Sequence, residues 1–251
     1  MENPTITIVI PVYNVENFVN ETLLSVKNQI SQPDEVILIN DGSTDNSSSI
    51  LSNYKNLYGW KIILTKNQGL GLTRNFGISI AKSDYIYFLD SDDIIKNDLI
   101  ERMRKIIHQY KKPDMILFSG ESFDDNGKNN KKPNLKFTID GEYFRGSKLI
   151  TKLTKKNETL PQASRYITKV ELWTKNKLTY PKGIAEDEAV FFPLLALSES
   201  TVVIPEIYYK YRLGRPGSIT MGLPNSDHAR DFLHRINFKM EFMILKSDLI
   251  R

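Results

Sequence analysis

Short apolar runs alternate with helix-like segments over the first third of the chain. The runs cover residues 5–12, 35–40, 61–64 and 85–89 and are rich in Ile, Val and aromatic side chains. Such runs are typical of strands buried on both faces of a sheet. Between them, apolar residues recur every three or four positions, which predicts helices over 15–30, around 50–57 and into 81. The alternation predicts an α/β fold whose first strands are parallel, since crossover connections are right-handed.

The pattern is less regular after residue 93. It predicts a helix over 99–111 and a strand over 115–118, then a polar excursion over 120–136 with a hairpin turn at 125–127. Further helices are expected over 149–153, 170–176 and 188–197, with strands over 202–204 and 208–213. Residues 227–249 read as one long amphipathic helix. We therefore expect one domain with halves 1–118 and 119–225, followed by a C-terminal helix, 226–251.

Three carboxylates follow the fourth apolar run directly, in the tetrapeptide Asp90-Ser91-Asp92-Asp93. In an open α/β sheet, ligands bind beyond the carboxyl ends of the strands. Carboxylates two residues apart can converge on Mg²⁺ or Mn²⁺, which prefer oxygen ligands. The alternative is structural, because Asp also forms turns and caps helices.

Composition excludes several classes of site and partner. The 251 residues contain no cysteine, so disulfides and thiolate metal sites are absent, and the three histidines lie far apart. No signal pattern or membrane-spanning run is evident, so we expect a cytoplasmic protein. The net charge is +4, but the lysine pairs are scattered, which favours a solvated surface over a nucleic-acid interface.

Several motifs, in this order and spacing, resemble those of family 2 glycosyltransferases. They are Ile10-Pro-Val-Tyr-Asn14, Asp41-Gly-Ser-Thr-Asp45, Gly69 with Arg74-Asn75 and Gly77, Asp90-Ser-Asp-Asp93, Tyr180-Pro-Lys-Gly183, Glu186-Asp-Glu188, Tyr208-Tyr-Lys-Tyr-Arg212 and Gly217-Ser-Ile-Thr220. The resemblance implies the GT-A fold, a Rossmann-like and mostly parallel central sheet flanked by helices, with a C-terminal helical extension on the acceptor side.

The resemblance also implies site residues. Pro11, Val12 and Tyr13 would line a uridine pocket, and Asp41 would bond the uracil edge. The donor would further meet Arg74, Asp90 and Ser91, while Asp92 would hold Mn²⁺ or Mg²⁺. Asp187 would be the catalytic base, with Glu186 as the fallback. Further candidates from the same motifs are Glu16, Asn67, Gly69, Arg212 and Ser218.

The function implied is the transfer of a single sugar from a UDP-sugar to a glycan or lipid-linked oligosaccharide, with inversion, in capsule or O-antigen synthesis. Two alternatives stay open: a sugar nucleotidyltransferase and a non-catalytic nucleotide-sugar-binding module. The first calls for a Gly-rich phosphate loop after the first strand, where this chain has Pro11-Val-Tyr-Asn14. The terminal helix could lie on the inner face of the membrane, or pack on the core or in a homodimer.

Overall fold

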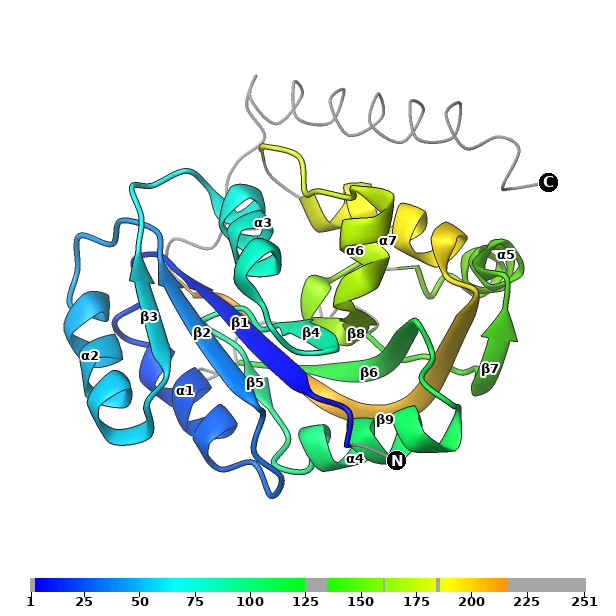
Figure 1. The fold of residues 1–251 in the computed structure, drawn as a ribbon, viewed down its shortest axis with the longest axis horizontal. Helices are drawn as coiled ribbons and strands as arrows, with labels where there is room; N and C mark the ends of the chain where they lie inside the picture. Colours follow the sequence, from blue (N-terminus) through cyan, green and yellow to red (C-terminus); the bar gives the residue numbers. More distant parts are fainter. Residues whose placement is uncertain (1–2, 125–134, 160, 184–185, 216–251) are drawn as a thin grey trace.

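The computed structural model describes residues 3–124, 135–159, 161–183 and 186–215. Within these residues the chain forms one nine-stranded sheet with helices on both faces (Figure 1). The strand order is β3-β2-β1-β4-β8-β6-β9-β5, and β7 also pairs with β9. The strands are β1 (Ile6–Val12), β2 (Glu35–Asn40), β3 (Lys61–Leu64), β4 (Tyr85–Phe88), β5 (Ile94–Ile95), β6 (Met115–Phe123), β7 (Gly141–Phe144), β8 (Tyr166–Lys169) and β9 (Ser200–Arg212).

The parallel half of the sheet confirms the prediction from the apolar runs. β1 lies between β2 and β4, and these pairs and β2–β3 are all parallel. Every residue of β1 is buried. Alternate residues Ile6, Ile8 and Ile10 pack on one face of the sheet, while Val9 packs on the other. A strand covered on both faces is nearly continuous in its apolar character, which is why its sequence signal is strong.

Two groups of helices cover the two faces. The first group is α1 (Val19–Lys27), α2 (Ser47–Tyr58) and α4 (Leu99–Gln109). The second group is α3 (Leu70–Ile80), α5 (Gly146–Lys156), α6 (Val170–Asn176) and α7 (Glu186–Leu197). Helix α1 is shorter than predicted, because Val15 begins a turn in which its carbonyl accepts the amides of Phe18 and Val19, both at 2.9 Å.

Three strands that the sequence did not predict join the same sheet, and two of them, β7 and β8, come from the second half of the chain. β8 lies antiparallel between β4 and β6, and β5 and β7 both pair antiparallel with β9. β6 crosses the expected boundary between residues 118 and 119, so the two halves share one sheet. The prediction of a polar excursion directly after 119 was wrong for residues 120–123, which continue β6.

The prediction of two separate strands over 202–213 was also wrong. β9 is a single strand of 13 residues that passes through Pro205. Its register against β6 shifts beside this proline, where Phe118 faces Ile204 and Ser119 faces Ile207. Proline has no amide hydrogen to donate, and a bulge accommodates it without ending the strand.

Two predicted elements lie outside the described residues: the hairpin turn at 125–127 and the terminal helix over 227–249. No helix in the described part of the chain combines the length and apolar character needed to cross a membrane.

Candidate active site

The candidate residues gather at the carboxyl edge of the parallel strands. Pro11 and Val12 end β1, Asp41 directly follows β2, and the acidic tetrapeptide follows β4. The three strands are parallel neighbours, so their carboxyl ends meet at one edge. Tyr13 is 46% exposed there, whereas Pro11 and Val12 are buried. The sequence therefore placed these residues together correctly.

Asp41 organises the loop that leads into α3. Its buried carboxylate accepts hydrogen bonds from Thr65 Oγ1 at 2.9 Å and from the amides of Gln68 and Gly69 at 3.1 and 2.9 Å. Gly69 has φ +94°, a conformation that favours glycine. Asp41 thus fixes the loop beside the expected uridine pocket, while Asn67 of that loop is exposed.

Glu16 links two loops at the same edge. Its Oε2 accepts the amide of Asn46 at 2.8 Å, and its own amide donates to Asp45 Oδ2 at 3.0 Å. The amide of Asn14 donates to Ser43 Oγ at 3.1 Å. These bonds give Glu16 a structural role in joining the loops after β1 and β2.

The acidic turn is anchored through its last member, Asp93, which is 1% exposed. Tyr209 Oη and the amide of Arg212 donate to its carboxylate, the latter at 2.7 Å. Arg212 Nε also donates to the carbonyl of Asp92 at 2.8 Å. Burial and the nearby carboxylates of Asp92 and Asp90 raise the pKa of Asp93. Tyr209 and Arg212 of β9 therefore hold the acidic turn in place.

Asp92 remains at the surface of this turn. Its side chain is 14% exposed and pairs with the guanidinium of Arg215. Burial raises the pKa of Asp92, Arg215 opposes that shift, and Asp90 adds to it. The carboxylate thus stands in a site that needs a positive charge.

Arg74 joins the acidic turn to the start of α7. It is 1% exposed, and its Nη2 lies 2.7 Å from Asp90 Oδ1 while its Nη1 pairs with Glu186. Its guanidinium carbon lies 5.3 Å from the ring centroid of Tyr180. Burial opposes the charge, but Asp90 and Glu186 together raise the pKa of Arg74. Arg74 was expected near the donor, and the structure places it between Asp90, itself a donor-binding candidate, and Glu186.

Asp187 follows Glu186 in the first turn of α7 and is half-buried. Burial raises its pKa to about 7, the charge of Glu186 adds to the rise, and Arg74 opposes it. The amide of Glu188 donates to Asp187 Oδ1 at 2.8 Å. Glu186, in contrast, is 4% exposed and held by Arg74. Of these two neighbouring carboxylates, Asp187 is thus the one suited to exchange a proton near neutral pH.

Arg212 and Ser218 are two further candidates. Arg212 is buried, pairs with Glu21, and lies over the ring of Phe18 at 5.3 Å. Ser218 lies outside the described residues. Sequence reasoning missed Ser164, whose hydroxyl accepts the amide of Asp90 at 3.2 Å. No sequence signal marks this residue, because it comes from a short turn before the unpredicted strand β8.

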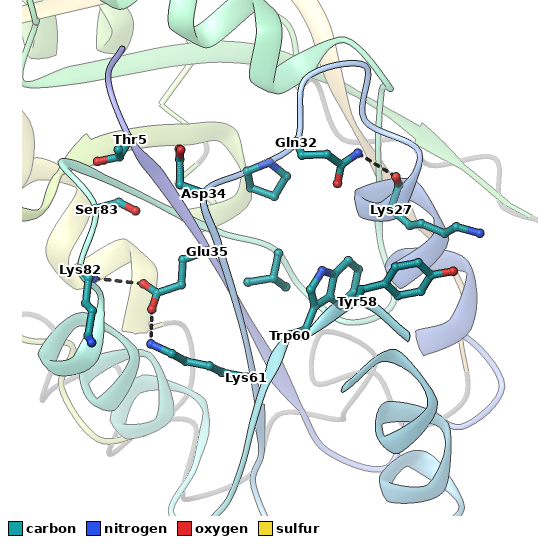
Figure 2. A pocket seen from close by; sticks show the side chains of 13 residues that line it. Thr5, Lys27, Gln32, Asp34, Glu35, Tyr58, Trp60, Lys61, Lys82 and Ser83 are labelled. Atoms are coloured by element: carbon teal, nitrogen blue, oxygen red, sulfur yellow. Dashed lines mark hydrogen bonds and ion pairs between the residues drawn. The ribbon is translucent and has the colours of Figure 1, made fainter. Parts of the chain in front are cut away.

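A separate hollow of about 790 Å³ lies at the opposite, amino-terminal end of β1 and β2 (Figure 2). Thr5, Asp34 and Glu35 line it together with Trp60. Glu35 pairs with Lys61 and accepts the amide of Lys82 at 3.0 Å. None of the expected site residues contributes to this hollow, which is therefore distinct from the candidate active site.

Comparison with known proteins identifies the family. The family model for glycosyl transferase family 2 matches residues 7–177. The glycosyltransferase GlyG of Streptococcus pneumoniae is 28% identical over an alignment 254 residues long, gaps included. The alignment covers 96% of this chain and 81% of GlyG. The poly(ribitol-phosphate) beta-glucosyltransferase of Bacillus spizizenii is 32% identical over 219 residues, 84% of this chain and 33% of that protein. The chain spans only 31% to 44% of the length of three further relatives that it matches.

Solved structures agree on the fold. Residues 1–349 of TarS from S. aureus in complex with UDP-GlcNAc superimpose with a TM-score of 0.75 at 21% identity, covering 95% of this chain and 71% of that one. The complex of the same TarS fragment with UDP gives a TM-score of 0.74 at 22% identity, covering 96% and 65%. This likeness confirms the expected GT-A fold of a central sheet flanked by helices, although the sheet is mixed rather than mostly parallel, with four parallel and four antiparallel pairs. The family match extends from β1 through the acidic turn to helix α6, more than half of the chain, and the chain therefore belongs to glycosyltransferase family 2.

Proposed function

We propose that this protein is an inverting, metal-dependent glycosyltransferase that transfers one sugar from a UDP-sugar to a hydroxyl group of its acceptor. The observation that carries the proposal is the bridge made by Arg74. It binds Asp90 of the acidic turn and Glu186, the neighbour of Asp187. The bridge links the turn that carries Asp92 to the helix turn that carries Asp187, which supports a cation-binding role for the first carboxylate and a proton-accepting role for the second.

The donor would lie along the carboxyl edge of the sheet. Pro11, Val12 and Tyr13 would line the uridine pocket, and Asp41 holds the loop that closes one side of it. Asp90 and Ser91 would meet the ribose. TarS, a structural neighbour, was solved with UDP and with UDP-GlcNAc, which supports a UDP-linked donor.

Asp187 would act as the base. Its carboxylate takes the proton of the acceptor hydroxyl while that oxygen bonds to the anomeric carbon and the bond from this carbon to the diphosphate breaks. Attack from the face opposite the leaving group inverts the configuration. A pKa of about 7 leaves Asp187 substantially ionised at neutral pH and makes it a stronger base than an ordinary carboxylate.

The residues present fit a hard divalent cation. Asp92 offers carboxylate oxygen in a site that now holds the cation of Arg215. In the described ranges, no cluster of three or more potential metal-ligating side chains occurs. Mg²⁺ commonly takes one or two carboxylates and completes its shell with water and substrate phosphates. Mn²⁺ or Mg²⁺ at Asp92 would offset the charge that develops on the departing diphosphate.

The acceptor would be a glycan or lipid-linked oligosaccharide of a bacterial surface polysaccharide, such as capsule or O-antigen. The relative that glucosylates poly(ribitol-phosphate) supports a task of this class. Such acceptors are built at the inner face of the cell membrane, so we propose a cytoplasmic protein that contacts this face peripherally.

The test is UDP release from a panel of UDP-sugars, with and without Mn²⁺, for the wild type and for Asp92→Ala. Asp98→Ala, beyond β5, serves as the control for loss of a carboxylate. We expect turnover of one donor only with the metal, its loss in Asp92→Ala and its retention in Asp98→Ala. Turnover that persists in Asp92→Ala would contradict the metal assignment. If no donor turns over and calorimetry detects no UDP binding, the uridine pocket itself is refuted.

A further inference from the structure

One face of α3 is fitted to the chain that leads into α7. Gly71, Arg74 and Asn75 are three and four residues apart, so they share a face of the helix. This face contacts Tyr180 and Pro181 and, further along the chain, Glu186. α3 and α7 also lie side by side on the same face of the sheet (Figure 1).

Asn75 binds the backbone of Tyr180 in both directions. Its Nδ2 donates to the carbonyl of Tyr180 at 2.8 Å, and its Oδ1 accepts the amide of the same residue at 2.7 Å. The side-chain amide of Asn75 thereby pairs both backbone groups of Tyr180, its C=O and its N–H. Tyr180 is 1% exposed, with its ring stacked on Trp173 at a centroid distance of 5.1 Å. The position of this segment is therefore fixed at both its backbone and its side chain.

Gly71 lets the two elements approach closely. A Cβ atom at this position would lie 2.5 Å from the carbonyl oxygen of Pro181 and 3.2 Å from Glu186 Cγ. Contacts this short require the backbone to move. Arg74, one turn further along α3, completes the attachment through its ion pair with Glu186.

We propose that Asn75 and Gly71 are positioning residues that set the placement of Asp187 relative to the donor site. The inference rests on the proposed function, in which Asp187 is the base. Donor-binding residues belong to the strand ends and the acidic turn, whereas Asp187 belongs to α7. The α3 face contacts the first residue of this second element directly through Glu186, so a small shift there changes the distance over which the proton is passed. Misplacement of a reacting group by about 1 Å can cost on the order of a hundredfold in rate.

The test compares Asn75→Ala with Ser79→Ala. Ser79 lies one helical turn beyond Asn75, is exposed, and bonds only within its own helix, to the carbonyl of Phe76. The readouts are UDP affinity by calorimetry and the turnover of whichever UDP-sugar the wild type uses. We expect Asn75→Ala to lower kcat at least tenfold with UDP affinity within twofold of the wild type, and Ser79→Ala to change neither.

A double-substitution cycle shows whether Asn75 acts through Asp187. In an Asp187→Asn background, Asn75→Ala should cost little further in kcat, since the base is already lost. If the two effects multiply instead, the positioning role is refuted. Equal losses of UDP affinity and kcat, with a lower Tm, would also refute it, because they indicate general destabilisation.

Hydrogen exchange tests the attachment without relying on activity. The amide of Tyr180 should exchange faster in Asn75→Ala than in Ser79→Ala, because it loses its acceptor. Unchanged exchange would overturn the proposal. If the wild type turns over no UDP-sugar, the proposed function fails, and the exchange result still stands on its own. Should Asn75→Ala not fold, Gly71→Ala perturbs the same helix face and takes its place in the affinity, turnover and double-substitution measurements.

Discussion

The charge of Glu186 should set the acid limb of the pH profile, because it is one cause of the raised pKa of Asp187. Burial is the largest cause, Glu186 comes next, and Arg74 opposes both. The substitution that isolates this contribution is Glu186→Gln. Its amide oxygen can still accept from Arg74 Nη1, so the contact survives while the negative charge is lost.

The expected shift follows from Coulomb's law. Two unit charges roughly 7 Å apart, in surroundings of effective dielectric constant about 20, interact by about 2 kcal/mol. That energy corresponds to a pKa change of about 1 to 2. The contribution of Arg74 adds to that of Glu186, so its presence does not alter the difference. From a starting pKa of about 7, Asp187 in Glu186→Gln should titrate between about 5 and 6.

The measurement is kcat/KM for the active UDP-sugar between pH 5 and 9. A base must be deprotonated to act, so the wild-type rate should fall tenfold per pH unit below about 7. In Glu186→Gln this fall should begin at lower pH, and the plateau rate should decrease somewhat because a weaker base remains. Glu171→Gln, an exposed change of the same charge on α6, should leave the limb unmoved. An unchanged limb in Glu186→Gln, or no acid limb in the wild type, would refute the assignment of Asp187.

Three further substitutions test the packing that holds the site. Asp41→Ala should cost about 2 to 3 kcal/mol in urea unfolding and weaken UDP binding, since it leaves the buried donors of the loop before α3 unpaired. Tyr209→Phe should cost about 1 to 3 kcal/mol by the same assay, because Asp93 loses a donor in a buried site. Gly77→Ala should destabilise by about 1 to 3 kcal/mol, since its Cβ would lie 2.6 Å from Val9 Cγ1, and Val9→Ala should recover part of that loss. A cost below about 0.5 kcal/mol in any of the three would contradict the corresponding contact.

The strands of the parallel half were predictable because burial on both faces leaves a strong local signal. β1, β2 and β4 are mostly apolar and almost entirely buried, and turn residues follow them, so both their positions and their common edge follow from the sequence. The acidic turn was found for the same reason, since it interrupts such a run abruptly. Asp187 was located only through the resemblance to a family, as nothing in its surrounding sequence distinguishes it from an ordinary first-turn carboxylate.

Strands β7 and β8 were missed because their stability comes from the strands with which they pair. β8 has only four residues and is held between β4 and β6, strands distant from it in the sequence. β7 is four residues long, none of them fully buried. Its pairing partner β9 follows more than fifty residues later, so no local periodicity marks it. Pro205 lies between the two strands that were predicted, and proline is unusual inside a strand. The bulge against β6 accommodates it, so β9 continues as one strand.

The structure gives Arg74 and Asn75 contacts that the sequence did not predict. The resemblance to family 2 glycosyltransferases implied that Arg74 lies near the donor. In the fold, Arg74 contacts Glu186, 112 residues later, and Asn75 contacts Tyr180, 105 residues later. Both side chains thus bind the part of the chain around the start of α7. If the buried Arg74 lost either Asp90 or Glu186, it would lose one of its two ion pairs, and a hydrogen bond to a charged group typically contributes about 1.5 to 3 kcal/mol. The acidic turn and the start of α7 are thus bound to one guanidinium, and displacement of either element carries an electrostatic penalty. Arg74 and Asn75 of α3 therefore fix where the segment before α7 and the first turn of α7 lie relative to the acidic turn.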